Sequence, residues 1–328
     1  MKDTILKGLV LRGSQNIFTV RIETETSPFE LECRIKGKVL KESGGFYNPL
    51  APGDQVMAEA DAANPGTGQI VSLVKRTNVF SRFNEKGQAP QLLAANVDIA
   101  LCLTTHISPP FRPRFLDRVI LQADAAGIMP VIVCNKIDLA VDDPDVDERL
   151  EDFRRIGYPV FFISAKTTEG IDELCNFIDG KCTVMIGQSG VGKSSLINAL
   201  YPQANIKTGL INEKYDRGNH TTVMAQMFEI PATGASGYFK SAVRLIDVPG
   251  IRRFVPDGIQ GSDLIFLMRE FAPLAGECSY GLSCSHRIEP GCKIMEAVDA
   301  GVIHEDRYSS FLRIHDELNG KSVKKYDE

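Results

Sequence analysis

Apolar and polar residues alternate over short runs in the first 75 residues, as in strands that bury one face. The runs cover residues 17–22, 29–35, 54–59 and 69–74. Turn-forming pairs such as Gly44-Gly45 and Pro52-Gly53 separate them, and no helical period is evident. Residues 1–75 are therefore expected to form a small closed barrel of about five strands, with an OB-fold as the leading candidate.

A different pattern begins near residue 92, where apolar strand-like runs alternate with amphipathic helix-like runs. The expected strands are 97–104, 131–134, 160–163, 182–186 and 243–246, and the expected helices are 115–126, 145–156, 171–178 and 193–200. This alternation predicts a parallel α/β sheet with helices on both faces. The acidic run 142–152 is expected to be a solvated helix face.

The segments on either side of the α/β region have their own patterns. Residues 76–91 are polar and are expected to be a linker, whereas 259–328 are helix-like. The predicted organisation is an N-terminal β-barrel (1–75), a linker (76–91), an α/β domain (92–258) and a mostly helical C-terminal domain (259–328). The length of 328 residues is consistent with two or three domains.

Charge and composition narrow the class of protein. The net charge is −5, so the whole molecule is not a cation built to coat nucleic acid, although a local basic face is possible. Such a face would lie on or beside the barrel and use Lys36, Lys38, Lys41, Lys75, Arg76 and Arg82; the alternative is that these are scattered surface charges. The uncharged stretch 99–111 has 13 residues, too few to span a bilayer, and no signal-peptide pattern is present. A cytoplasmic monomer without a membrane partner is expected.

A glycine-rich segment follows the expected strand 182–186 and matches the P-loop pattern GxxxxGK[ST]. It consists of Gly187, Gln188, Ser189, Gly190, Val191, Gly192, Lys193 and Ser194, followed by Ser195. Its glycines let backbone N–H groups turn toward phosphates, and the next helix presents its N-terminus to that negative charge. Lys193 is expected to reach the β- and γ-phosphates as a catalytic residue, and the Ser194 hydroxyl to ligate Mg²⁺.

Two further segments indicate that the base is guanine. Asn135-Lys136-Ile137-Asp138 resembles the NKxD element, in which the Asp accepts hydrogen bonds from guanine N1 and N2. Adenine offers no such donors, so a P-loop ATPase or kinase is disfavoured. Ser164-Ala165-Lys166 follows the next strand and resembles the second base-contacting loop, in which the Ala165 N–H meets guanine O6.

The γ-phosphate side has two more candidate segments. Asp247-Val248-Pro249-Gly250 resembles the DxxG element, with Asp247 acting on Mg²⁺ through a water and the Gly250 N–H sensing the γ-phosphate. Thr221 and Thr222 lie in a segment that resembles a switch loop, and Thr222 is favoured as the Mg²⁺ ligand. Many GTPases place a Gln after DxxG to orient the attacking water, but this chain has Ile251. His220 is the candidate for that role; the alternative is that it contacts only protein or RNA.

The order of these motifs along the chain is permuted. Ordinary small GTPases run P-loop, switch Thr, DxxG, NKxD and SAK, whereas NKxD and SAK come first here. A compact domain tolerates such a change if the old ends are joined and new ends open elsewhere. The permutation leads from DxxG directly into 259–328, so the switch region is expected to be tethered to the C-terminal domain.

Three cysteines and one histidine cluster near the C-terminus as Cys278-x5-Cys284-x-His286-x5-Cys292. They supply a complete Cys₃His set for one tetrahedral Zn²⁺, and four protein ligands leave no open position for catalysis. A structural zinc is therefore predicted, with free thiols in a loop as the alternative.

The barrel, the permuted GTPase motifs and the Cys₃His segment together resemble the RsgA/YjeQ family of ribosome-assembly GTPases, over nearly the whole chain. One departure is the spacing of the first two zinc cysteines, with five residues between them where four are expected. The resemblance implies a GTP/GDP- and Mg²⁺-dependent hydrolase that binds the small ribosomal subunit and its rRNA, assists late maturation and times its own release. A second hypothesis is an RNA-binding assembly module that uses GTP as a conformational latch, with incidental hydrolysis.

Overall fold

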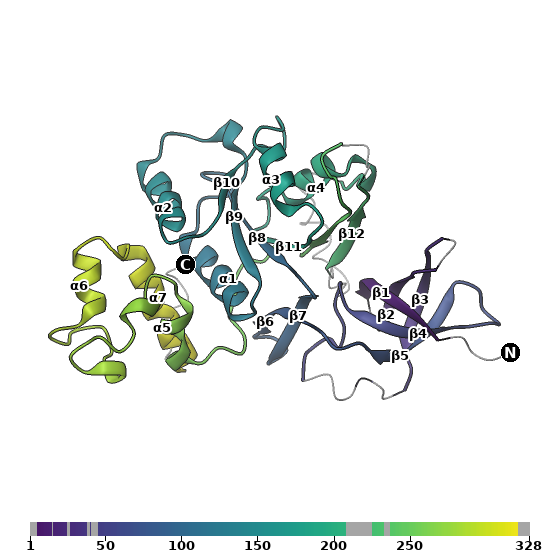
Figure 1. The fold of residues 1–328 in the computed structure, drawn as a ribbon, viewed down its shortest axis with the longest axis horizontal. Helices are drawn as coiled ribbons and strands as arrows, with labels where there is room; N and C mark the ends of the chain where they lie inside the picture. The colour runs from purple at the N-terminus through teal and green to yellow at the C-terminus, as the bar shows by residue number, and fades with distance from the viewer. Residues whose placement is uncertain are drawn as a thin grey trace.

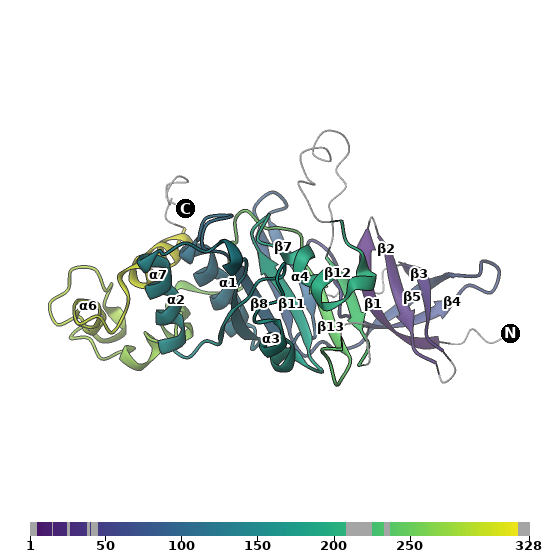
Figure 2. The same ribbon diagram turned by 90° about the horizontal axis from the view of Figure 1, so that it is seen from above.

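The computed structural model describes residues 5–14, 16–24, 27–37, 40, 45–207, 225–232 and 237–320. Three units follow one another along the long axis of the molecule (Figures 1 and 2). The barrel lies at one end, the α/β domain is central, and a small helical unit lies at the other end.

Five strands form the N-terminal barrel: β1 (Ile5–Ser14), β2 (Ile17–Ile22), β3 (Phe29–Ile35), β4 (Gln55–Ala60) and β5 (Thr67–Leu73). Their order is β1-β2-β3-β5-β4, and antiparallel pairing of β4 with β1 closes the barrel. Only the β3–β5 pair is parallel among these strands. Alternate side chains, including Val10, Val20 and Ile70, fill the interior. This confirms the predicted OB-like barrel.

The range 76–91, expected as a linker, instead holds strand β6 (Val79–Asn84) and the start of β7 (Ala89–Ala95). They form a separate two-stranded antiparallel sheet. Phe80 is fully buried and its ring lies 5.8 Å from that of Phe254. The segment is polar in composition because side chains such as Arg82 and Gln91 are bonded to each other across the two strands. Its strands therefore lack the apolar alternation that would have predicted them.

The central sheet contains β8 (Ile99–Thr104), β9 (Met129–Cys134), β10 (Val160–Phe162), β11 (Cys182–Gly187), β12 (Gln226–Ile230) and β13 (Val243–Asp247). Its order is β10-β9-β8-β11-β13-β12. The first five strands in this order are parallel, and β12 runs antiparallel to β13.

Helices cover both faces of this sheet, as the alternating pattern predicted. The helices are α1 (Pro113–Ala125), α2 (Pro144–Arg155), α3 (Ile171–Ile178) and α4 (Lys193–Leu200). Successive residues of β11 enter opposite layers, so Val184 packs in the layer of α1 and α2 and Met185 in that of α3 and α4. Short 3₁₀ turns η1 (Ile137–Leu139) and η2 (Pro202–Ala204) lie in the connections.

The C-terminal unit packs α5 (Leu264–Leu267), α6 (Lys293–Asp299) and α7 (Glu305–Leu318) around a small core. Its 3₁₀ turns are η3 (Gly261–Asp263), η4 (Ala272–Leu274) and η5 (Gly281–Ser283). Phe271 stacks on Phe311 with 4.7 Å between ring centroids, and Leu121 of α1 joins the same core. Among the described residues, no helix is both long and apolar enough to cross a membrane.

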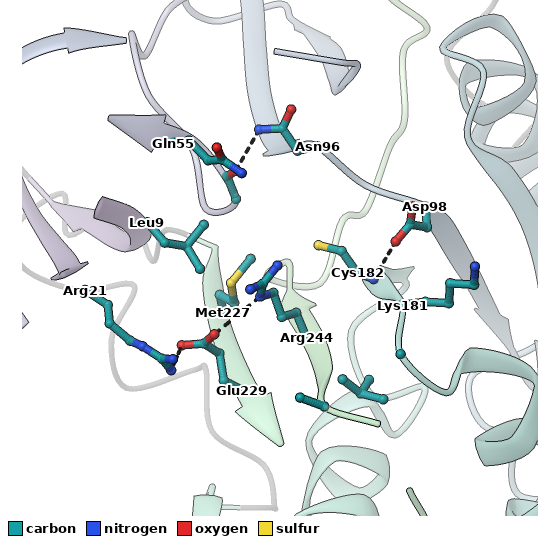
Figure 3. A pocket seen from close by; sticks show the side chains of 14 residues that line it. Leu9, Arg21, Gln55, Asn96, Asp98, Lys181, Cys182, Met227, Glu229 and Arg244 are labelled. Atoms are coloured by element: carbon teal, nitrogen blue, oxygen red, sulfur yellow. Dashed lines mark hydrogen bonds and ion pairs between the residues drawn. The ribbon is translucent and has the colours of Figure 1, made fainter. Parts of the chain in front are cut away.

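The barrel pairs with the edge of the central sheet at one ladder position, where Arg12 of β1 lies opposite Gln226 of β12. Beside this pair is a cavity of about 370 Å³, lined from the barrel by residues such as Leu9 and Arg21 and from the sheet by residues such as Lys181 (Figure 3). Glu229 bridges the gap, because it pairs with Arg21 on one side and Arg244 on the other.

Candidate functional site

The predicted nucleotide motifs come together at the carboxyl edge of the parallel strands, where open α/β sheets bind ligands. The P-loop follows β11, the NKxD segment follows β9 and the SAK segment follows β10. Asp247 is the last residue of β13. Four loops that are distant in the sequence therefore meet at one edge of the sheet.

The P-loop requires its glycines for two physical reasons. Gly190 and Gly192 have φ angles of 83° and 99°, which L residues with a Cβ rarely adopt. A Cβ on Gly192 would also lie 2.3 Å from Asn135 Nδ2. The loop then turns into α4 at Lys193, with Ser194 and Ser195 half-buried in its first turn. This is the strand, loop and helix that phosphate binding requires.

Lys193 and Asp247 are opposite charges beneath the P-loop, the first buried and the second half-buried. Lys193 Nζ donates to the Gly187 carbonyl oxygen at 3.3 Å, and burial lowers the pKa of Lys193, with Asp247 opposing that effect. Burial raises the pKa of Asp247 to about 6, with Lys193 acting in the opposite direction. Asp247 Oδ1 has no hydrogen-bond partner among the described residues. A buried acceptor without a partner fits a site for a hydrated cation, and the buried ammonium fits a phosphate.

The DxxG segment lies directly against the P-loop. A Cβ on Gly250 would come within 2.8 Å of the Ser189 backbone, so this close approach requires glycine. The Ile251 N–H donates to Gly187 O at 3.2 Å, and its side chain is buried in the central core. Ile251 is thus packed into the protein and offers no polar side chain for a water.

Asn135 joins three loops on the base side of the site. Its Nδ2 donates to Val191 O of the P-loop at 3.0 Å, and its Oδ1 accepts from the Ala165 N–H at 3.1 Å and from the Lys136 N–H at 2.8 Å. The Ala165 N–H, predicted to meet guanine O6, is thus bonded to Asn135 in this structure. One amide therefore sets the spacing between NKxD, SAK and the P-loop.

The neighbouring side chains of NKxD and SAK are also bonded to one another and to the P-loop. Ser164 Oγ donates to Asp138 Oδ1 at 2.8 Å, while Lys166 Nζ lies 3.8 Å from Asp138 Oδ2 and is 79% exposed. Lys136 has a left-handed backbone with φ of 64°, and its Nζ donates to Gly190 O at 2.7 Å and to Ser108 O at 2.8 Å. Its aliphatic stem is therefore held across the site.

The structure also brings in a loop that the motif search missed, residues 105–112 after β8. Its Ser108 carbonyl holds Lys136, and Pro109 lies beside Gly190. His106 in this loop is buried and bonded to two other side chains. The available signal was its position, because this loop follows a buried strand at the ligand edge of the sheet.

Other predicted residues have different outcomes. His220, Thr221 and Thr222 lie outside the described residues, as do Lys38 and Lys41. Four residues of the expected basic face lie in the described part of the chain. Arg76 makes a two-pronged ion pair with the buried Asp54, and Arg82 is bonded inside the β6–β7 hairpin. Lys36 pairs with Glu59, and Lys75 is exposed.

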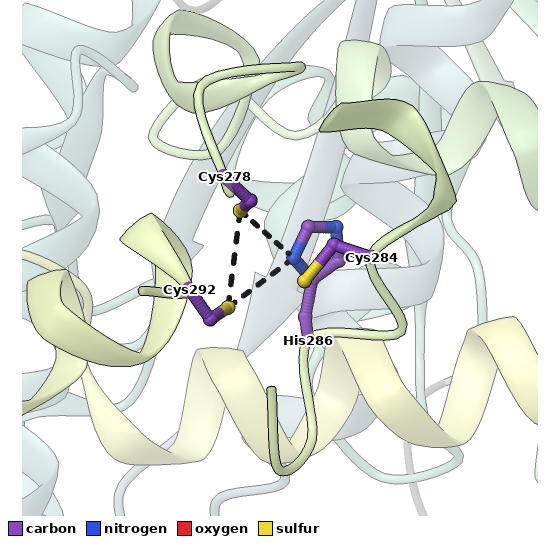
Figure 4. A group of neighbouring side chains, drawn as sticks. All are labelled: Cys278, Cys284, His286 and Cys292. Atoms are coloured by element: carbon purple, nitrogen blue, oxygen red, sulfur yellow. Dashed lines mark hydrogen bonds between the residues drawn. The ribbon is translucent and has the colours of Figure 1, made fainter. Parts of the chain in front are cut away.

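The Cys₃His cluster is preformed. The side chains of Cys278, Cys284, His286 and Cys292 are buried, converge (Figure 4), and have potential ligand atoms all within 4.8 Å of one another. The Cys278 and Cys292 sulfurs are 3.9 Å apart and lie 3.6 and 3.5 Å from His286 Nδ1. Tetrahedral zinc, with Zn–S of about 2.3 Å and Zn–N of about 2.0–2.1 Å, separates its ligand atoms by about 3.5–3.8 Å. The donor set and its spacing therefore fit structural zinc, and the extra residue between Cys278 and Cys284 does not prevent convergence.

Comparison with known proteins agrees with this geometry. The family model described as RsgA GTPase matches residues 73–255. The "Small ribosomal subunit biogenesis GTPase RsgA" of Borreliella afzelii is 36% identical over 97% of both chains. That of Chlorobaculum parvum is 35% identical over 97% of this chain and all of the relative.

Two solved structures are similar as well. YjeQ from Thermotoga maritima has a TM-score of 0.71 and 28% identity, covering 97% of this chain and all of that one. YloQ, described as a circularly permuted GTPase, has a TM-score of 0.66 and 25% identity, covering 98% and 97%. With the permuted motifs assembled at one sheet edge, these matches show that the chain belongs to the RsgA GTPase family.

Proposed function

We propose that this GTPase acts on the small ribosomal subunit, hydrolysing GTP to assist late maturation and to time its own release. The observation that carries the nucleotide-site assignment is Asn135, which bonds both the P-loop and the SAK segment. The subunit assignment is supported by relatives that are named small ribosomal subunit biogenesis GTPases and match nearly the full chain. Such a factor would work in the cytoplasm, where ribosomal subunits assemble.

On the phosphate side, the P-loop residues Gly187 to Ser195 would surround the phosphates with backbone N–H groups. Lys193 would move from Gly187 O to the β- and γ-phosphates, since its present bond is long and its charge is buried. Ser194 and Thr222 would hold Mg²⁺ through their hydroxyl groups. Asp247 would hold it through a water. Mg²⁺, when bound, neutralises charge on the transferring phosphoryl group.

On the base side, Asp138 is the residue that would distinguish guanine from adenine. Ser164 already occupies one side of Oδ1, which fixes the carboxylate in one orientation. Asn135, Lys136, Ala165 and Lys166 would complete the base pocket. A carboxylate fixed in this way rejects a base that lacks matching donors, because its buried lone pairs would be left unpaired.

Hydrolysis needs a group that orients the attacking water, and Ile251 cannot supply one because its side chain is buried among apolar residues. His220 is proposed for that role. Intrinsic turnover should then be slow, and docking on the ribosomal subunit would position His220. A His220→Ala variant with unchanged subunit-stimulated turnover would remove His220 from the mechanism.

The outer units would bind the partner and hold the fold. A five-stranded OB-like barrel is a common platform for oligonucleotides, and the proposed partner contact is with rRNA. One structural zinc in the Cys₃His cluster would tie together the loops of the C-terminal unit. The protein is proposed to act as a monomer.

The deciding experiment measures GTP hydrolysis with and without isolated small subunits. We expect marked stimulation by small subunits and none by large subunits. Lys193→Ala should abolish stimulated turnover, whereas Lys181→Ala, an exposed lysine at the opposite edge of the sheet, should not. Equal rates with and without small subunits would contradict the proposal.

The same variants test the second hypothesis, in which GTP acts only as a latch. If Lys193→Ala still docks on small subunits and supports their maturation as well as the native chain does, hydrolysis is incidental. Equal affinity for ATP and GTP would instead contradict the guanine assignment.

A further inference from the structure

We propose that His106 is a positioning residue for guanine-nucleotide binding, acting through the loop 105–112 and the NKxD strand. The inference deepens the proposed nucleotide site and rests on it. It concerns residues that none of the recognised GTPase motifs in this chain contains. It also gives a role to a side chain whose sequence context offered none.

The ring of His106 makes one hydrogen bond at each nitrogen. Its Nδ1 lies 3.5 Å from Cys134 Sγ, and its Nε2 lies 3.0 Å from Asp147 Oδ1. Burial raises the pKa of the Cys134 thiol to about 12, so the sulfur keeps its proton and can donate it to Nδ1. Nε2–H then donates to Asp147. In the neutral imidazole, these two partners place the proton on Nε2.

These two bonds connect three separate elements. Cys134 ends β9 and immediately precedes Asn135, the residue that joins the nucleotide loops. Asp147 lies in the first turn of α2, and His106 begins the loop after β8. The His106 ring therefore fixes the end of β9 against both the neighbouring loop and the helix behind it.

The loop 105–112 carries this constraint to the nucleotide side. His106 O accepts from the Phe111 N–H at 3.0 Å, and Thr105 Oγ1 donates to Pro109 O at 2.6 Å, so the loop is closed on itself. Its Ser108 O then accepts from Lys136 Nζ, which also donates to Gly190 O. Loop and NKxD strand are thus joined twice, by His106 in the interior and by Lys136 at the site.

This arrangement predicts an effect on binding rather than on chemistry. The groups tied by His106 lie on the base side. Lys193 and Asp247 lie on the phosphate side, where Lys193 begins α4 and Asp247 ends β13. Removal of the two His106 hydrogen bonds should allow the side chains of Lys136 and Asn135 to occupy a wider range of positions. The nucleotide would then bind more weakly and leave faster, while the turnover of bound GTP would be unchanged.

The test compares His106→Phe with the native chain in nucleotide affinity, dissociation rate, KM and kcat. Fluorescent GDP and GTP are the probes, and no ribosomal subunit is present. Loss of ordinary hydrogen bonds corresponds to about a three- to tenfold change in an equilibrium constant, so we expect KM and Kd to rise by that amount. The kcat should stay within about twofold.

Companion variants separate positioning from general stability. Cys134→Ser keeps a donor and should bind nucleotide nearly as the native chain does, whereas Cys134→Ala should lose part of the affinity. Asp147→Ala is a further probe that cannot unfold the core, because Asp147 is 55% exposed; about a twofold loss is expected. The double variant Cys134→Ala/His106→Phe should be no weaker than His106→Phe alone, because both changes break one chain of bonds.

The matched control is His304→Phe, which removes the side chain that caps α7 far along the chain from the site. It should lower the melting temperature and leave nucleotide affinity unchanged. Unchanged affinity in both His106→Phe and Asp147→Ala would overturn the proposal, as would a fall in kcat at constant KM. Because no subunit is present, lack of subunit stimulation leaves this result unaffected, while loss of GTP binding by the native chain would reject the site itself.

Discussion

The central domain is held on its two flanks by different kinds of contact. Toward the C-terminal unit, Arg307 of α7 is 1% exposed and donates to Asp117 of α1 at 2.9 Å and to Glu270 at 2.9 Å. Arg149 of α2 donates to the same Asp117 at 2.9 Å and to Asp152 at 3.0 Å. We call this group of five residues the buried ion network. It crosses the interface in a region closed to water.

Toward the barrel, the contact with β12 involves fewer paired residues and is more exposed to solvent. One ladder pair joins the strands there, a cavity of about 370 Å³ lies beside it, and Glu229 bridges to Arg21, which is 26% exposed. The barrel is held better on its other side. There Asn48 exchanges two hydrogen bonds of 3.0 Å with the Leu92 backbone of the hairpin. The barrel is thus anchored to the hairpin and loosely joined to β12.

This difference between the two flanks indicates which of them can change position when nucleotide binds. β12 is the first described strand after 208–224, the range that includes the candidate switch residues. The segment after DxxG instead runs onto the hairpin, where Val255 O accepts from the Phe83 N–H at 2.9 Å. The expected tether to the C-terminal domain therefore passes along β6 first. We expect any movement to appear at the barrel and the C-terminal unit to stay fixed.

The largest expected effect is removal of zinc from the fixed flank. A structural zinc contributes on the order of 10 kcal/mol to isolated zinc-finger peptides, so chelation or Cys292→Ala should unfold the C-terminal unit. Metal analysis should find one zinc per native chain and none in the variant. Cys175→Ala, a buried cysteine of the central domain, should keep the metal. Unfolding curves that are identical with and without chelator would contradict a structural zinc.

Breaking the buried ion network should be next in size. Arg307→Met leaves Glu270 and Asp117 buried with fewer partners, and removal of one member of a buried pair costs about 3–5 kcal/mol in the free energy of unfolding. Arg287→Met, in a half-exposed pair with Asp316 in the same unit, should cost less than about 1 kcal/mol. Denaturant unfolding measures both. If the two variants lose equal stability, the buried ion network holds the C-terminal unit no better than a half-exposed ion pair does.

A change at the nucleotide site should leave the stability of the contacts on both flanks unchanged and so serves as a reference. The pKa of Asp247 is raised to about 6 by burial, so its carboxylate is protonated below that pH. Cation binding needs the ionised form. The Mg²⁺-dependent affinity for GDP should therefore fall as pH decreases through about 6, by up to about tenfold per pH unit.

The matched variant for this measurement is Asp247→Asn. It should bind weakly at every pH, and subtracting its profile removes the titration of the nucleotide itself. Parallel profiles for the two proteins between pH 5 and 7 would show that Asp247 is not the titrating group.

The smallest effect on stability is expected at the barrel joint. Glu229→Gln breaks the half-exposed pairs with Arg21 and Arg244, which should cost less than about 1 kcal/mol and should be masked by salt. The position of the barrel should nevertheless change, and small-angle scattering should show a broader distribution of shapes at low salt. Glu151→Gln, in an exposed pair on α2, is the control. An unchanged scattering curve would mean that the hairpin alone sets the barrel position.

Much of the fold could be predicted because hydrophobic periodicity and local motifs carry it. Strands β8, β9, β11 and β13 follow apolar runs, and the nucleotide loops have short local signatures. The Cys₃His set was likewise readable, because ligand type and spacing are local properties of the sequence. The sequence alone could therefore predict elements that depend on residues close together in the chain.

Contacts between distant residues were not accessible. The run 142–152 does present a solvated acidic face, since Asp142, Asp145, Asp147, Glu148 and Glu151 are exposed. Within it, however, Arg149 and Asp152 are buried, because Asp117 and Arg307 come from far away in the chain to complete the ion network around Arg149. The role of His106 was hidden for the same reason, since Asp147 lies 41 residues from it and Cys134 lies 28. The hairpin was missed because polar side chains such as Arg82 and Gln91, which are bonded across its strands, resemble those of a linker.

The pairing of β1 with β12 has a consequence for the rest of the molecule. Without the barrel, β12 would be the outermost strand of the central sheet, with unpaired N–H and C=O groups along one side. Exposed edges of this kind are templates for intermolecular β-pairing and aggregation. The barrel therefore also acts as an edge cover, and a truncated chain that begins after it should self-associate even if its nucleotide loops fold correctly.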